Sequence, residues 1–137
     1  MEGVKLPPRD SATFDVMDLS PEERQEYNDV YYDYLEKTSP GYTSHLLGYP
    51  EQQQGNMQLE SQLVSNGMYC GDSTGYNSSE AQALKAAAHE WRLLFQLSSE
   101  ENALMMWGDA GCLYFWIREQ DLKDMKFDKT WFALQCG

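Results

Sequence analysis

Residues 104–117, LMMWGDAGCLYFWI, join an apolar run, a Gly-Asp-Ala-Gly turn and six consecutive apolar or aromatic residues. A short apolar run after a turn is typical of a buried strand, so we predict a turn followed by a strand over residues 111–117. A strand that is apolar on both faces needs cover on both faces. The segments on either side must therefore supply the layers that close over it.

Two further segments show the two-residue alternation of strands. Residues 91–97, WRLLFQL, are predicted to place four apolar side chains on one face: Trp91, Leu93, Phe95 and Leu97. Residues 130–136 alternate in the same way, with Phe132 and Leu134 on one face and Trp131 and Ala133 on the other. We expect the three strands to pair largely antiparallel.

Helices are predicted near residues 21–36, 57–65 and 79–89, with a shorter one over 119–125. The first has a clear start, because Ser20 can cap it, Pro21 suits the first helical position and Glu23 completes a capping box. Helices that cover a small, mostly antiparallel sheet make an α+β fold. We divide the chain into an irregular lead-in, residues 1–19, and a single α+β domain, residues 20–137.

The first predicted helix carries a stripe of large side chains at helical spacing: Tyr27, Val30, Tyr31, Tyr34 and Leu35. Such a stripe is compatible with a face that stacks on a ligand. It is more typical of a packing face whose hydroxyl groups reach the rim. We interpret it as packing.

The chain is strongly acidic. Its 137 residues include 22 Asp and Glu against 10 Lys and Arg, a formal net charge of −12. This charge disfavours nucleic acid and anionic membranes as partners and suits a basic protein partner. The opening residues lack the apolar stretch of a signal peptide, and no run approaches the roughly 18 apolar residues of a membrane span, so we expect a cytoplasmic location.

Three cysteines, Cys70, Cys112 and Cys136, are widely spaced and include no CxxC pair. They match neither a disulfide framework nor a zinc site. A metal site built from His45, Cys70, Asp72 and His89 also lacks a recognised ligand spacing. We expect no metal and no cofactor.

Several motifs occur in order along the chain: HLLGYP at 45–50, QLESQLVSNG at 58–67, WGDAG at 107–111 and YFWI at 114–117. Together they resemble the YwqG-like family of bacterial proteins, a domain of unknown function. The resemblance covers roughly residues 5–136. It implies an α+β protein without established enzymatic activity, corresponding to the C-terminal half of longer members. It also implies that one apolar sheet face lacks its usual cover here, which favours a homo-oligomer.

Loop residues supply the candidate site. The ligand-binding candidates are His45, Tyr49, Glu60, Trp107 and Asp109. The catalytic candidates are His45, Cys70 and Asp72, because a thiol nucleophile needs a base beside it and an orienting carboxylate, for which Glu60 is the alternative. His45 can equally be a loop histidine that bonds backbone groups.

The turn at 107–111 has a structural interpretation as well as a binding one. The Asp109 carboxylate can accept turn amides, while Gly108 and Gly111 allow a positive φ or a close approach.

Residues 71–75, GDSTG, match the G-x-S-x-G pattern of a hydrolase nucleophile elbow. An elbow needs a buried strand before it, then an acid and a histidine in that order. Here a loop precedes the serine, and His89 follows too soon for an intervening acid. We interpret these residues as turn residues.

Two hypotheses for function follow. The first is a non-catalytic, acidic protein-interaction module rather than an enzyme, with an unidentified protein partner and, by analogy with related bacterial families, an immunity-like role. The alternative is a small-ligand-binding or hydrolytic site formed by the His45 to Pro50, Cys70 to Asp72 and Asp109 loops. The alternative requires these loops to meet in one concave pocket.

Overall fold

The computed structural model describes residues 6–38 and 42–137. Its centre is a four-stranded sheet of order β1-β2-β3-β4 in which every neighbouring pair is antiparallel. The strands are β1 (His45–Leu46), β2 (Trp91–Ser98), β3 (Cys112–Arg118) and β4 (Trp131–Gln135). The predicted α+β class is confirmed, and so are the three predicted strands. β1 escaped prediction because two residues are too few to show an alternation.

Six helices accompany the sheet in the described ranges: α1 (Ala12–Asp15), α2 (Pro21–Thr38), α3 (Met57–Ser65), α4 (Ser73–Tyr76), α5 (Ser79–Lys85) and α6 (Glu119–Lys123). Short 3-10 turns lie at η1 (Ala88–Glu90), η2 (Glu101–Ala103) and η3 (Phe127–Lys129). The predicted capping box is present, because the Glu23 amide donates to Ser20 Oγ at 3.2 Å and the Ser20 amide donates to Glu23 Oε2 at 2.8 Å. None of these helices is long and apolar enough to cross a membrane.

The lead-in contributes to the folded core. Ser11 caps α1, and both Ala12 and Phe14 are buried. The Phe14 ring lies 4.8 Å from that of Tyr27, and the Tyr27 hydroxyl donates to Pro7 O at 2.7 Å. α2 therefore packs on the lead-in, whose apolar islands are too short to show a period. The first five residues of the predicted lead-in lie outside the described residues.

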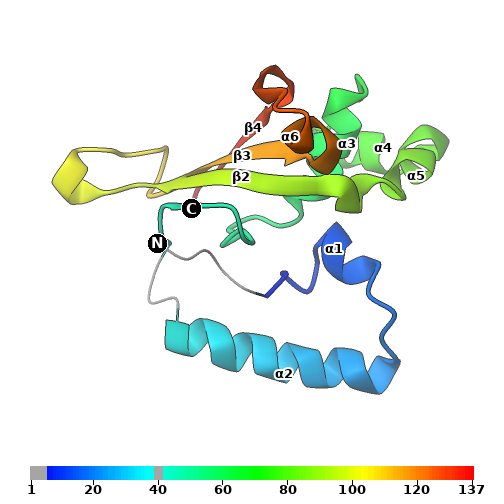
Figure 1. Cartoon of the computed structure of the whole chain (residues 1–137), viewed down its shortest axis with the longest axis horizontal. Helices are drawn as coiled ribbons and strands as arrows, with labels where there is room; N and C mark the ends of the chain where they lie inside the picture. Colours follow the sequence, from blue (N-terminus) through cyan, green and yellow to red (C-terminus); the bar gives the residue numbers. More distant parts are fainter. Residues whose placement is uncertain (1–5, 39–41) are drawn as a thin grey trace.

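One face of the sheet is covered. α3 packs on it, and the buried cluster there comprises Met57, Trp91, Leu93, Cys112, Tyr114, Trp116 and Ala133. Helices α3, α4 and α5 gather at the right-hand end of the sheet in Figure 1, whereas α2 lies below it. The coil at residues 51–55 runs between α2 and the strands (Figure 1).

The register of β2 shifts in mid-strand. Leu93 pairs with Trp116, but Phe95 pairs with Phe115, so one residue of β2 has no opposite partner. Such a β-bulge turns the following side chains to the other face. The prediction that Trp91, Leu93, Phe95 and Leu97 share a face is therefore wrong, because WRLLFQL carries no local signal for an extra residue.

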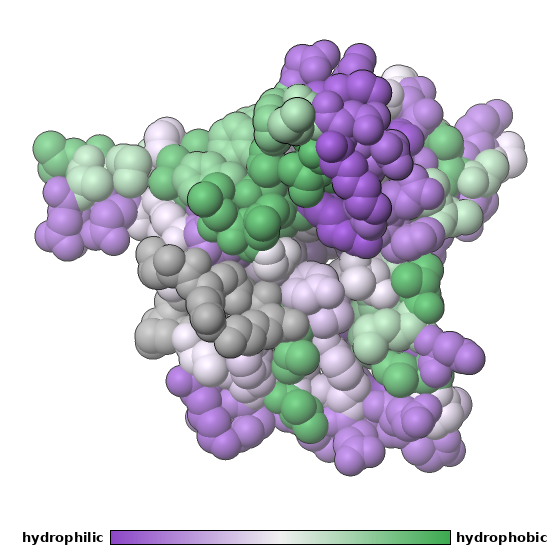
Figure 2. Space-filling model, viewed as in Figure 1, coloured by the Kyte–Doolittle hydropathy of each residue, from purple (hydrophilic) through white to green (hydrophobic). Residues whose placement is uncertain are grey.

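The second face carries the fully buried Ile117 and seven apolar side chains that are at least partly exposed, which we call the open face: Leu46, Phe95, Leu97, Leu113, Phe115, Phe132 and Leu134. Leu46, Phe132 and Leu134 are 67%, 50% and 45% exposed. Ring centroids are 6.0 Å apart for Phe95 and Phe115 and 5.5 Å for Phe115 and Phe132, which forms an aromatic row across three strands. Figure 2 shows an apolar area over the strands. The expectation of cover on both faces of β3 is met fully on one face, and on the other face only at Ile117, whereas Leu113 and Phe115 stay partly exposed.

Candidate functional site

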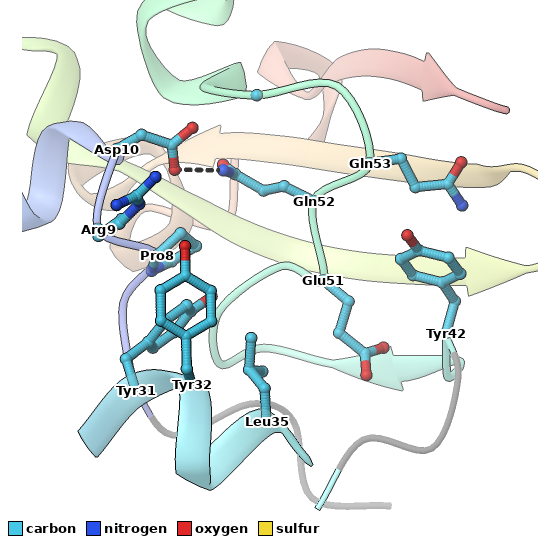
Figure 3. Close-up of a pocket in the computed structure, with 11 residues that line it drawn as sticks. Pro8, Arg9, Asp10, Tyr31, Tyr32, Leu35, Tyr42, Glu51, Gln52 and Gln53 are labelled. Carbon is cyan, nitrogen blue, oxygen red and sulfur yellow. Dashed lines mark hydrogen bonds between the residues drawn. The ribbon is translucent and has the colours of Figure 1, made fainter. Parts of the chain in front are cut away.

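A pocket of about 580 Å³ separates α2 from the coil at residues 51–55. Tyr31, Tyr32 and Leu35 rise into it from α2, while Glu51 and Gln52 face them from the coil (Figure 3). The remaining lining residues are Pro8, Arg9, Asp10, Tyr42, Gln53 and Gly55. The pocket exists because α2 packs at its N-terminal end on the lead-in and leaves a gap toward its C-terminal end.

Glu51 is the most buried acidic residue of the lining, at 7% exposure. Its carboxylate oxygen Oε2 accepts three hydrogen bonds, from Thr43 N at 2.7 Å, Thr43 Oγ1 at 3.0 Å and Gln96 Nε2 at 2.8 Å. A buried carboxylate needs such donors, because loss of hydration is otherwise costly. The second oxygen, Oε1, accepts no hydrogen bond from the described residues.

Side chains of β2 and β3 hold the backbone of Glu51 in place. Its amide donates to Gln96 Oε1 at 2.9 Å, and its carbonyl accepts from the Tyr114 hydroxyl at 2.6 Å. Gln96 also donates to Thr43 O at 2.7 Å, which fixes the neighbouring coil. Gln96 reaches this position because the β-bulge turns it into the core. The pocket floor is therefore preorganised by β2 and β3.

The opposite wall is aromatic. Tyr31 is buried and lies 5.9 Å, centroid to centroid, from Tyr32, whose ring is exposed. Burial, assisted by the negative charge of Asp10, raises the pKa of Tyr31 to about 12, so its phenol is neutral at physiological pH. The Arg9 guanidinium lies 5.6 Å from the centre of the Tyr32 ring. Asp10 Oδ1 accepts from Gln52 Nε2 at 2.9 Å across the pocket (Figure 3).

The chemistry of this lining suits binding. Its described residues include no cysteine, serine or histidine that could act as a nucleophile with its base. They offer π faces, two carboxylates and two side-chain amides.

The predicted catalytic residues lie apart. His45 is in β1 and Cys70 lies in a groove with Trp131 of β4, so they are at opposite edges of the sheet. His45 Nδ1 lies 2.9 Å from Leu47 O, a local backbone contact. The loops named in the alternative hypothesis do not converge in one pocket. In the described part of the chain, no three His, Cys, Asp or Glu side chains are placed to hold a metal ion.

Cys70 and Glu60 are the two candidates that the structure brings together, in the groove beside Trp131. Burial raises the pKa of the Cys70 thiol, the nearby Tyr76 hydroxyl lowers it, and the charge of Glu60 raises it again. Burial also raises the pKa of Glu60. A reactive cysteine requires a lowered pKa, so this environment favours the neutral thiol.

The other candidates have structural contacts. Asp72 caps α4 by accepting from Thr74 N at 2.8 Å. Tyr49 lines a small cavity over Trp91 and Trp116. The Trp107 amide donates to Ser99 Oγ at 2.9 Å.

The turn at 107–111 closes through its backbone. The Gly111 amide donates to Trp107 O at 2.8 Å, and the Asp109 carbonyl accepts from the Gly137 amide at 3.1 Å. No described residue donates to the Asp109 carboxylate. The expectation that this carboxylate accepts hydrogen bonds from the turn amides is therefore wrong. The glycine roles are confirmed, because Gly108 has φ +59° and a Cβ on Gly111 would lie 2.4 Å from Gln135 O.

The sequence analysis missed the pocket residues Arg9, Asp10, Tyr32, Tyr42, Glu51 and Gln52. They come from four separate segments, which no local spacing connects. The available signal was the run of tyrosines on α2, which we interpreted as packing.

Comparison with known proteins places the chain in a family. A search of curated proteins finds no match. A family profile described as a domain of unknown function, DUF1963, matches residues 4–136, which covers nearly the whole chain. This agrees with the unknown-function domain expected from the motifs, whereas the narrower YwqG-like assignment and the C-terminal-half correspondence stay predictions. The chain belongs to the DUF1963 family, a domain of unknown function.

Proposed function

We propose that this chain is a non-catalytic protein-interaction module and that its interaction surface is the open face, occupied by a second copy of the chain. The observation that carries the proposal is the exposure of Leu46, Phe132 and Leu134 beside the aromatic row of the same sheet. Large contiguous apolar patches on folded proteins mark interaction sites.

The chemistry of the face favours a second copy. The seven side chains of the open face are all leucine or phenylalanine, and Arg92 beside them is paired with Glu119, so one copy offers another a largely apolar surface of the same kind. Two sheets packed face to face form a sandwich, a stable two-layer architecture. Two protomers related by a twofold axis present the same patch to each other, as isologous dimers do.

Apolar burial and charge oppose each other in this assembly. Full burial of one leucine or phenylalanine contributes roughly 1.5–3 kcal/mol, and each copy supplies three that are about half exposed. The net charge of −12 on each copy resists association. Exposed charges farther apart than about 8 Å are largely screened at physiological salt, so we expect the apolar term to dominate.

The first prediction concerns molecular mass. Light scattering coupled to size exclusion is expected to give a mass rising with concentration toward twice the 15.8 kDa of one chain. Leu46→Ser combined with Leu134→Ser is expected to restore the monomer, because both polar side chains would lie in the interface. The thermal midpoint of that monomer should change little, since both leucines are exposed.

Leu104→Ser is the matched control, because Leu104 is 94% exposed but lies in the connection between β2 and β3, outside the open face. It should leave the dimer intact. A wild-type chain that stays monomeric at every concentration contradicts the second copy and favours a different occupant, such as the partner of an immunity-like protein. Equal loss of the dimer in the control variant would also contradict this surface.

A further inference from the structure

We propose that the tyrosine-lined pocket between α2 and residues 51–55 binds an alkylammonium cation, with Glu51 as the anionic partner and the tyrosine rings as the wall. The proposal is independent of the open face. Its basis is a buried carboxylate, an aromatic lining and a cation already present in the pocket.

The first argument is the state of Glu51. This side chain is 93% buried, yet Oε1 accepts no hydrogen bond from the described residues while Oε2 accepts three. A buried anion with an unused lone pair favours a cationic donor. Because Gln96 and Tyr114 already hold the backbone of Glu51, little reorganisation is needed when a donor arrives.

The second argument is the lining. Neutral tyrosine rings attract cations through their π faces, and the raised pKa of Tyr31 keeps that ring un-ionised over the physiological range. Leu35 and Pro8 add apolar surface for an alkyl body. The volume, about 580 Å³, is within the usual range of small-molecule sites.

The third argument is Arg9. Its guanidinium occupies one side of the Tyr32 ring at 5.6 Å, so this wall already accepts a cation supplied by the chain itself. Arg9 is exposed and forms no salt bridge among the described residues. An incoming ammonium would compete with Arg9 for the ring and meet its charge repulsion. Removal of Arg9 should therefore strengthen binding.

The test is a titration of the ¹⁵N-labelled full chain with n-butylammonium chloride, followed by amide chemical shifts at constant ionic strength. We expect saturable shifts confined to residues that line the pocket, with a millimolar Kd. The neutral isostere n-butanol is the reference ligand, and it should bind about tenfold more weakly or not measurably, since it lacks the charge. Equal binding of both ligands would overturn the proposal.

Two variants should act in opposite directions. Glu51→Gln is expected to weaken butylammonium about tenfold, whereas Arg9→Gln is expected to tighten it by several fold. Glu26→Gln, on the exposed surface of α2, is the matched control for loss of one negative charge and should leave Kd unchanged.

If Glu51→Gln fails to fold, the opposing prediction for Arg9→Gln still decides the matter. Weaker binding in Arg9→Gln would overturn the proposal, because Arg9 would then assist the bound cation instead of competing with it. Equal weakening in Glu26→Gln would overturn it by showing general attraction to an acidic surface. Spermidine and Nα-acetyl-lysine amide then distinguish the source of the cation. Tighter binding of spermidine indicates a free polyamine, and tighter binding of the lysine derivative indicates a lysine side chain.

Discussion

Gln96 connects the core to the pocket through three side-chain hydrogen bonds. It is fully buried at 0% exposure, accepts from the Glu51 amide and donates to both Glu51 Oε2 and Thr43 O. A buried glutamine is stable only when its partners are in place, and those partners depend equally on it.

We predict that Gln96→Leu lowers the free energy of unfolding by about 2–4 kcal/mol, because it leaves several buried polar groups without partners. Urea denaturation checks the value. Gln82→Leu on the exposed side of α5 is the control and should stay within about 0.5 kcal/mol of the wild type. A Gln96→Leu protein as stable as the wild type would show that this network does not support the fold.

Among the helices, α2 packs on the rest of the chain through its tyrosines. Tyr27 contacts Phe14 and Pro7, and among the described side chains of α2 Tyr31 alone is buried. Burial is the main cause that raises the pKa of both to about 12, from an ordinary value of 10.0. The helix is therefore held to the lead-in by phenols that must stay neutral.

This predicts a pH dependence with a definite sign. A group whose folded pKa is raised stabilises the fold below its unfolded pKa, and that contribution is lost as pH rises through the folded pKa. The free energy of unfolding should be level up to about pH 9 and fall between pH 10 and about pH 12. Denaturation across this range measures it, and a Tyr27→Phe variant should show a smaller slope. Stability that rises over the same interval would contradict the assignment.

Local patterns could be predicted from the sequence, whereas contacts between distant segments could not. The capping box at Ser20 and Glu23, the glycines of the 107–111 turn and the alternation of β4 are local patterns, and each is confirmed. The pocket could not be predicted, because it joins residues near 9, 31 and 51 that only the fold brings together. The bulge was missed because an extra residue leaves no mark on an apolar run.

For the whole molecule, the dominant property is its charge of −12. Two copies carry the same sign, so added salt should strengthen their association by screening the repulsion. We predict that the mass measured by light scattering rises between low and high sodium chloride at fixed protein concentration. A complex with a basic partner would weaken under the same change, which separates the two kinds of partner. A mass that falls with salt contradicts the apolar dimer.

The bulge in β2 has a consequence for how this chain tolerates changes of length. One unpaired residue places Gln96 under the pocket and Phe95 on the open face at once. Loss of that residue would exchange the two faces beyond it and remove both surfaces together. The loop between β2 and β3 can lengthen or shorten without this penalty. Both proposed binding surfaces therefore depend on the residue count of a single strand.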